Sequence, residues 1–142
     1  MTANVLTAAE LEARLRQAPF NAWMGLRVLA LDEDSVEIGL TWRPEIVSNP
    51  QMKVVHGGVL SALIDTAADF AIAAKLGRAV PTVDLRIDYH LPARPGDLRA
   101  RAKVVRLGGT LAVAEAEIFD GEGRMVASGR GTYFTAEPKN SP

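Results

Sequence analysis

One segment in the middle of the chain constrains the fold more than any other. Residues 57–75 form the only long stretch there that is compatible with a helix, and they are apolar almost all the way round. A helix of this kind must be covered on most of its sides. Asp65 and Asp69 interrupt the apolar run, which is shorter than the roughly 20 apolar residues that cross a membrane. The segment therefore predicts a helix buried inside a globular domain.

Strand-like segments lie on both sides of this helix, since apolar and polar residues alternate in them with a period of two. Short turns with glycine join the later segments, which indicates antiparallel hairpins. We expect an α+β domain in which a curved antiparallel sheet of five strands wraps around one long buried helix. The expected strands are residues 35–42, 82–90, 98–107, 111–119 and 124–135.

The two ends of the chain add less to the predicted core. Thr7 and Glu10 have the spacing of a capping box, which predicts a short N-terminal helix over about residues 7–18. Residues 1–142 are read as a single domain with a core over about 28–135 and a frayed polar tail over 136–142. The first residues lack the basic and apolar regions of a secretory signal, so we expect a cytoplasmic protein.

The composition argues against several classes of function. Lys and Arg together number 16 against 17 Asp and Glu, so no basic excess draws the chain to nucleic acid or to an anionic membrane. The absence of cysteine excludes disulfides, thiolate metal sites and a cysteine nucleophile. His56 and His90 are the only histidines, and their spacing does not match a metal site. We therefore expect no metal and no redox cofactor.

Candidate chemistry is concentrated in residues 54–70. Gly57 and Gly58 lie at the predicted start of the buried helix, where amide groups lack internal partners and the helix dipole attracts negative charge. A thioester carbonyl placed there would be polarised, and its oxyanion would be stabilised. Asp65 is costly on a buried helix unless it is paired, hydrogen-bonded or used. It could act as a general base toward water or attack the carbonyl itself.

The spacing of Gly57 and Asp65 has a consequence for assembly. Eight residues separate them by about 12 Å along the helix axis, with a rotation of roughly 80°. The two groups therefore cannot serve one carbonyl from the same helix. Two helices packed antiparallel about a two-fold axis would bring each glycine end near the partner's Asp65. We expect a homodimer with two equivalent sites.

Three segments of the chain carry motifs, which read HGGVLSALIDTA, PTVDLRIDYHLPARPGDL and DGEGRMVASGRGTYF. Together they resemble the hotdog-fold thioesterases of the phenylacetate-degradation (PaaI) type, over about residues 42–134. The resemblance implies hydrolysis of an acyl-CoA thioester to a free acid and CoA. It implies no cofactor, because CoA is part of the substrate, and it implies a dimer that commonly pairs into a dimer of dimers.

The resemblance also implies roles for single residues. The backbone N–H of Gly57 would polarise the thioester, Asp65 would be the base or the nucleophile, and Thr82 would help to orient the water. An Asn or Gln in the preceding loop would contact the reacting group. Asn49 is the candidate for that role and Gln51 the alternative, because a proline occupies the position that the family pattern gives to this residue.

Four neighbouring residues are candidates for substrate binding, and each has a structural alternative. Gly58 extends the helix start, and His56 would either touch the substrate or fix the loop by hydrogen bonding. Ser61 would touch the substrate or only pack the helix, and Asp69 would touch it or face solvent or an arginine. Basic residues of the later strands would form a solvated face or bind the phosphates of CoA. They are Arg99, Arg101, Lys103, Arg106, Arg124 and Arg130.

Two other functions stay open from the sequence. A non-hydrolytic acyl-CoA-binding module would be favoured by loss of the helix acid, but Asp65 is present. A hydroxyacyl-thioester dehydratase on the same fold would pair His56 with a helix acid. The related hydratase pattern of an aspartate and a histidine is not matched, because Asp84 and His90 are one residue too far apart.

Overall fold

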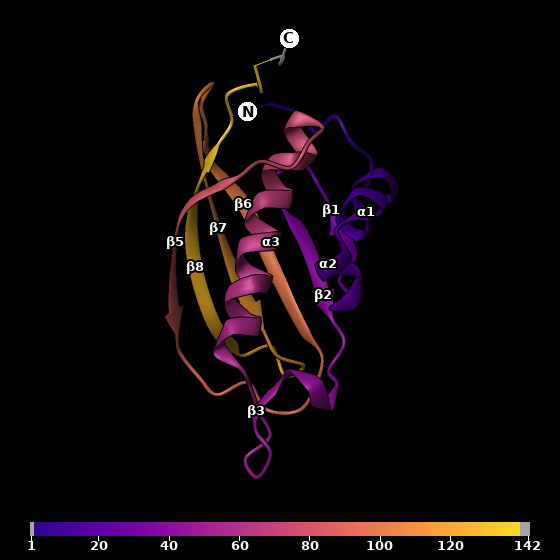
Figure 1. Cartoon of the computed structure of the whole chain (residues 1–142), viewed down its shortest axis with the longest axis vertical. Coiled ribbons are helices and arrows are strands. Elements are labelled where there is room, and N and C mark those ends of the chain that lie inside the picture. The colour runs from indigo at the N-terminus through magenta and orange to yellow at the C-terminus, as the bar shows by residue number, and fades with distance from the viewer. Residues whose placement is uncertain (1, 140–142) are drawn as a thin grey trace.

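An antiparallel sheet of six strands packs on one long helix in the computed structural model, which describes residues 2–139 (Figure 1). The strand order is β1-β2-β6-β7-β8-β5, and each neighbouring pair is antiparallel. The helices are α1 (Ala8–Gln17), α2 (Pro19–Trp23), a short 3₁₀ turn η1 (Pro44–Ile46) and α3 (Gly57–Leu76). The strands are β1 (Arg27–Leu31), β2 (Val36–Leu40), β3 (Val47–Asn49), β4 (Val54–Val55), β5 (Thr82–Tyr89), β6 (Leu98–Leu107), β7 (Leu111–Phe119) and β8 (Met125–Phe134).

The α+β class and the hotdog arrangement are confirmed, but the predicted number of five strands is wrong. Arg27–Leu31 forms a sixth strand at the edge of the sheet and pairs with β2. This segment reads RVLAL, which has no polar alternation, and its residues are exposed or only half-buried. A second difference lies in the loop predicted before α3, where β3 and β4 form a small separate ribbon.

Small side chains let the sheet approach α3 closely. Ala100 and Ala102 of β6 and Ala114 and Ala116 of β7 are buried on the inner face of the two central strands. Because alanine projects little beyond the backbone, the helix can lie directly on this part of the sheet. Larger buried side chains from the helix fill the remaining space of the core. They include Leu60, Leu63, Ile64 and Ile72.

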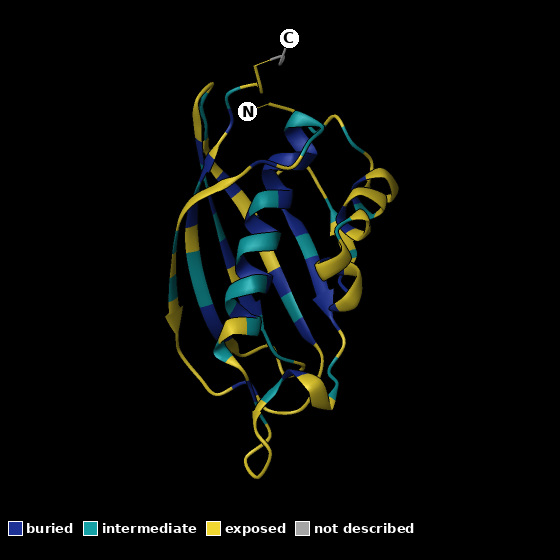
Figure 2. Ribbon diagram, in the orientation of Figure 1, coloured by how far each residue is buried: buried dark blue, intermediate teal, exposed yellow. Residues whose placement is uncertain are grey.

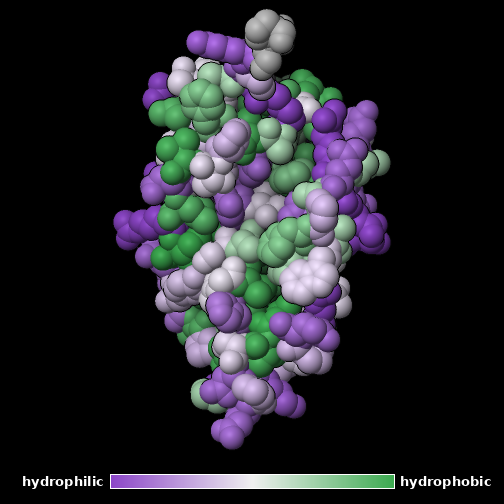
Figure 3. Space-filling model, in the orientation of Figure 1, coloured by the Kyte–Doolittle hydropathy of each residue, from purple (hydrophilic) through white to green (hydrophobic). Residues whose placement is uncertain are grey.

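One side of α3 is left open, although we expected the helix to be covered on most sides. Ser61, Asp65 and Asp69 follow one another at helical spacing and are half-buried, and no helix or strand within residues 2–139 is laid over Ser61 and Asp65 (Figure 2). The Val80 amide of the segment after α3 reaches the Asp69 end of this stripe. The edge strand β5 lies beside this stripe, and its Val83 and Tyr89 side chains are exposed. On the same view of the molecule, hydrophobic surface gathers along β5, whereas α1 is mainly hydrophilic (Figure 3).

The N-terminal helix begins as the capping box predicts. The Thr7 side chain accepts a hydrogen bond from the Glu10 amide at 3.2 Å, and the Glu10 carboxylate accepts one from the Thr7 amide at 2.8 Å. Residues 136–139 form no helix or strand, and the last three residues of the predicted tail lie outside the described residues. None of the helices within residues 2–139 has the length and apolar character needed to cross a membrane.

Candidate active site

Asp65 lies in the middle of α3 and is held by two hydroxyl groups of the sheet. The Thr82 hydroxyl donates to Oδ1 at 2.8 Å, and the Tyr133 hydroxyl lies 3.0 Å from the same oxygen and 3.1 Å from the Asp65 carbonyl oxygen. Both donors therefore converge on Oδ1, which leaves Oδ2 without a donor among residues 2–139. The structure thus brings two predicted site residues, Asp65 and Thr82, into direct contact.

Tyr133 is a contact that sequence reasoning missed. Its side chain is fully buried in β8, and a buried tyrosine hydroxyl needs a hydrogen-bond partner. Burial raises the pKa of Tyr133, and the nearby carboxylates of Asp65 and Asp69 raise it further. The hydroxyl therefore stays protonated over the whole working range of pH and acts as a donor. The sequence carries little signal for this contact, because Tyr133 stands near the end of a strand that also contains Ser128, Arg130 and Thr132.

The start of α3 carries the predicted glycine pair. His56 is the N-cap, and its Nδ1 accepts a hydrogen bond from the Gly58 amide at 2.8 Å. A Cβ at position 58 would lie 2.9 Å from this Nδ1, so glycine lets the imidazole ring come close. The Gly57 amide donates to no acceptor among residues 2–139, which leaves it available to a ligand. The ring of His56 thus fixes the helix start, which was the structural alternative for this residue.

A second tyrosine packs against the same helix end. The Tyr89 hydroxyl donates to the Gly57 carbonyl oxygen at 3.0 Å and lies 2.6 Å from the Ser61 hydroxyl. Ser61 also donates to the Gly57 carbonyl oxygen, at 3.1 Å. A Cβ at Gly57 would sit 3.4 Å from the Tyr89 ring. The glycine end of α3 is therefore lined by Ser61, one of the predicted site residues, and by Tyr89, which was not among them.

Asp69 lies one turn beyond Asp65, and the expectation that it would face solvent or an arginine is wrong. Its Oδ1 accepts a hydrogen bond from the Val80 amide at 3.0 Å, because the segment after α3 folds back over the helix. Burial raises the pKa of Asp69 to about 7, the Val80 hydrogen bond opposes this shift, and the charge of Asp65 adds to it. Asp69 therefore holds its proton to a much higher pH than an ordinary aspartate.

Asn49 and Gln51 lie in the β3–β4 ribbon, apart from the Asp65 cluster. Asn49 is exposed, and its Oδ1 accepts hydrogen bonds from the amides of Gln51 at 2.9 Å and Met52 at 3.0 Å. These bonds close a local turn. Within one chain, the structure brings neither side chain to Asp65 or to Gly57.

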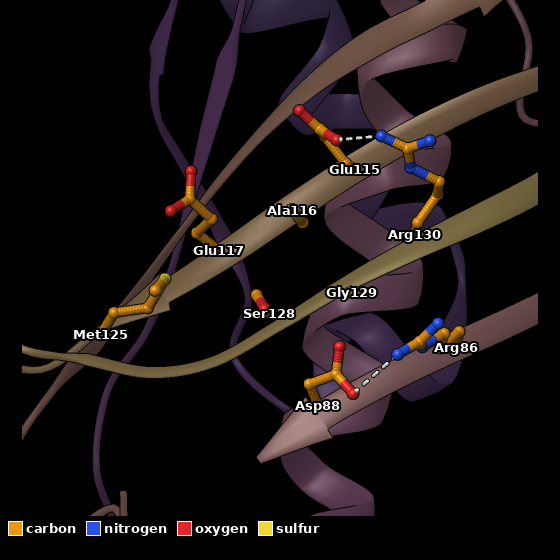
Figure 4. Close-up of a pocket in the computed structure, with 9 residues that line it drawn as sticks. All are labelled: Arg86, Asp88, Glu115, Ala116, Glu117, Met125, Ser128, Gly129 and Arg130. Atoms are coloured by element: carbon orange, nitrogen blue, oxygen red, sulfur yellow. Dashed lines mark hydrogen bonds and ion pairs between the residues drawn. The ribbon is translucent and has the colours of Figure 1, made fainter. Parts of the chain in front are cut away.

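Of the basic residues of the later strands, Arg124 lies in the turn before β8 and pairs with Asp120 at 2.9 Å, whereas Arg99, Arg101, Lys103 and Arg130 lie on the opposite face of the sheet from α3. An open depression of about 500 Å³ there is lined by charged side chains from β5, β7 and β8 (Figure 4). Arg130 and Lys103 both pair with Glu115, at 2.8 Å and 3.2 Å, and Arg86 lies 3.5 Å from Asp88. Charges that neutralise one another in this way are typical of a solvated face. The depression is separated from Asp65 and Gly57 by the sheet.

No group of three or more histidine, aspartate or glutamate side chains within residues 2–139 is arranged to hold a metal ion. His90, the second histidine, is exposed and lies beside Ser128, with 2.8 Å between Nε2 and Oγ. The polar groups near the open face of α3 are therefore hydroxyls, carboxylates and backbone amides.

The chain matches a family of thioesterases. The family model described as "Thioesterase superfamily" matches residues 52–127, which is more than half of the chain. The chain is 28% identical to the medium/long-chain acyl-CoA thioesterase YigI of Escherichia coli K12, over 82% of this chain and 84% of that protein.

Solved structures agree with this match. The crystal structure of a thioesterase-superfamily protein superposes with a TM-score of 0.87 and 42% identity, and covers 89% of this chain and 96% of that one. A phenylacetic acid degradation-related protein from Ralstonia eutropha JMP134 superposes with a TM-score of 0.75 and 27% identity, and covers 82% of this chain and 89% of that one. The narrower phenylacetate-degradation (PaaI) type stays a prediction. The chain belongs to the thioesterase superfamily and is a thioester hydrolase.

Proposed function

We propose that the protein hydrolyses acyl-CoA thioesters to a free carboxylic acid and CoA. The observation that carries this proposal is the Asp65 carboxylate, which is anchored through Oδ1 and half-buried on the open face of α3. A carboxylate with one unoccupied oxygen in such a place can take a proton or attack a carbonyl. The similarity to an E. coli protein named as a medium/long-chain acyl-CoA thioesterase supports CoA esters as the substrate class.

The Gly57 amide supplies the second half of the proposed chemistry. An N–H without an internal partner at the start of a 20-residue helix attracts negative charge, because the aligned peptide dipoles point the same way. A thioester carbonyl oxygen that accepts this hydrogen bond becomes more electrophilic at carbon, and the oxyanion formed on attack is stabilised. His56 and Gly58 keep the helix start in the conformation that presents this amide.

Two routes are consistent with this arrangement. In the first, a water oxygen attacks the carbonyl carbon while Asp65 takes its proton. The tetrahedral oxyanion then collapses, the carbon–sulfur bond breaks, and the CoA sulfur leaves with the electron pair and takes the proton from Asp65. In the second, Asp65 itself attacks the carbonyl, CoA leaves, and water hydrolyses the resulting anhydride. In the first route, Thr82 would orient the water from its position beside Asp65.

The site is proposed to form between two copies of the chain. Gly57 and Asp65 are separated by about 12 Å along one helix, so they cannot meet at one carbonyl within a chain. The open stripe of α3 and the exposed apolar side chains of β5 offer the surface that a second copy would cover. An isologous dimer across this face would bring each Gly57 near the partner's Asp65. The further pairing of two such dimers into a dimer of dimers is proposed from the resemblance to the family.

The test is release of CoA, followed with a thiol reagent, from phenylacetyl-CoA, benzoyl-CoA and straight-chain acyl-CoAs of increasing length. Asp65→Asn serves as the matched control, because it keeps the size and the Oδ1 acceptor of the side chain. We expect its turnover to be lower by about 100-fold or more, which is typical for loss of a positioned base. A variant with near-normal turnover would contradict the role of Asp65. Tight binding of acyl-CoA with no release from any ester would instead favour the binding-module alternative.

A further inference from the structure

Tyr133 reaches Asp65 by lying along its own strand. It projects from β8 toward α3, and its ring covers Gly131, two residues earlier on the same face. A Cβ at position 131 would lie 2.5 Å from the Tyr133 ring and hydroxyl, so only glycine leaves room for this course of the side chain. The side chain is fully buried, so its hydroxyl cannot turn to solvent for a hydrogen-bond partner.

Tyr133 and Thr82 act on the carboxylate as a pair. The two residues are direct partners in the antiparallel register of β5 and β8. Their hydroxyls approach the same oxygen, Oδ1, at 3.0 Å and 2.8 Å, and that of Tyr133 also lies 3.1 Å from the Asp65 carbonyl oxygen. Two donors from a rigid strand pair restrict both torsions of a short side chain. Oδ1 is thereby occupied by two hydrogen bonds, and Oδ2 is the oxygen that can react.

We propose that Tyr133 is a positioning residue, which holds Asp65 through Oδ1 so that Oδ2 is the oxygen that faces the reacting thioester. The inference rests on the proposed role of Asp65 and deepens it by naming the reacting atom and the group that selects it. Tyr133 does not touch the substrate, because its side chain is fully buried. It acts only through the carboxylate. The raised pKa of its hydroxyl keeps it a donor.

The kinetic test uses Tyr133→Phe, which removes only the hydroxyl. We expect kcat to fall by about 10-fold or more with KM within about 2-fold, since a misplacement of about 1 Å can lower a rate by ~100-fold. In an Asp65→Asn background the same change should have no further effect on the residual rate, because the two residues act as one unit. Additive losses in the double variant would overturn the proposal.

Thr135→Val is the matched control for loss of a buried hydroxyl. Thr135 is also buried, and its hydroxyl donates to the Gly108 carbonyl oxygen at 2.6 Å, away from Asp65. We expect this variant to keep the kcat of the unchanged protein. Gly131→Ala keeps the Tyr133 hydroxyl but displaces the ring, and should reproduce the loss of kcat. An equal loss of kcat in Thr135→Val and Tyr133→Phe would show a merely structural effect.

A structural readout separates this inference from the proposed function. In crystals of Tyr133→Phe we expect the Asp65 side chain in more than one rotamer, whereas a single unchanged rotamer would overturn the positioning role even if no thioester is turned over. If Tyr133→Phe does not fold, fluorotyrosine labelling replaces it. The chain has only two tyrosines, so Tyr89 is the internal reference. Asp65→Asn should shift the fluorine signal of Tyr133 and not that of Tyr89, and an unshifted Tyr133 signal would overturn the inference.

Discussion

The carboxyl group of Asp69 makes the free energy of unfolding depend on pH. Burial raises its pKa from the usual 3.8 to about 7, and the charge of Asp65 adds to the shift, so the folded protein holds this proton more tightly than the unfolded chain. The stability that this group contributes is present in full below pH 3.8 and is lost as the pH rises through about 7. At 1.36 kcal/mol per pKa unit, its upper limit is about 4 kcal/mol.

We predict that Asp69→Asn removes this dependence, because the amide oxygen can still accept from the Val80 amide but does not titrate. Denaturant unfolding from pH 4.5 to 8 should show a decline for the unchanged protein that is flattened in the variant. Asp32→Asn is the control, since backbone hydrogen bonds from Asp34 and Ser35 lower the pKa of Asp32 and leave it ionised over this range. Parallel curves for Asp69→Asn and the unchanged protein would contradict the prediction.

The sequence singled out those site residues that carry a local signal. Gly57 stands at a helix start and Asp65 on an apolar helix, and both features can be seen without knowing the fold. Tyr133 carries no such signal, because its contact with Asp65 depends on the course of the ring over Gly131. The prediction that Asp69 would face solvent or an arginine was wrong for a related reason. Helical spacing gives the face of the helix but not the segment that returns over it.

At the scale of one element, the start of α3 depends on His56 as its N-cap. We predict that His56→Ala lowers the free energy of unfolding by about 1 kcal/mol, the usual value for loss of a capping side chain. His56→Asn should keep both stability and turnover, because asparagine is a good capping acceptor. Thermal or denaturant unfolding and CoA release measure the two effects. If His56→Asn is stable but loses turnover, the imidazole contacts the substrate.

Elements with a clear period were predicted to within a residue or two, and elements without one were missed. The bounds of β6 and β7 coincide with the expected strands at residues 98–107 and 111–119. Each has one face on α3 and one face in solvent, which produces the alternation. β1 lies at the edge and is apolar in every residue after Arg27, so neither a period nor a polar face marks it. The pairing partner, rather than the local pattern, makes it a strand.

At the scale of the whole molecule, two adjacent surfaces are left incompletely covered. The stripe of α3 at Ser61, Asp65 and Asp69 is only half-buried. The neighbouring strand β5 exposes the large side chains of Val83 and Tyr89, which a globular domain would normally bury. The sequence pattern of β5 predicts an apolar face, and in one chain Leu85 and Ile87 of this face are half-buried against the core. A second copy of the chain, seated on this face, would cover both surfaces.

The dimer and the division of the site between its chains can be tested with two inactive variants. Gly57→Pro removes the proposed oxyanion donor at a helix position where proline is tolerated, and should lower turnover by about 100-fold or more. Asp65→Asn removes the base. A hybrid of the two chains, purified through a different tag on each, has one site with both groups intact and one with neither. We expect it to recover about half of the normal turnover per dimer. A purified hybrid that stays inactive would mean that Gly57 and Asp65 do not meet across chains, and a monomeric protein that hydrolyses thioesters would mean that the dimer is not needed at all.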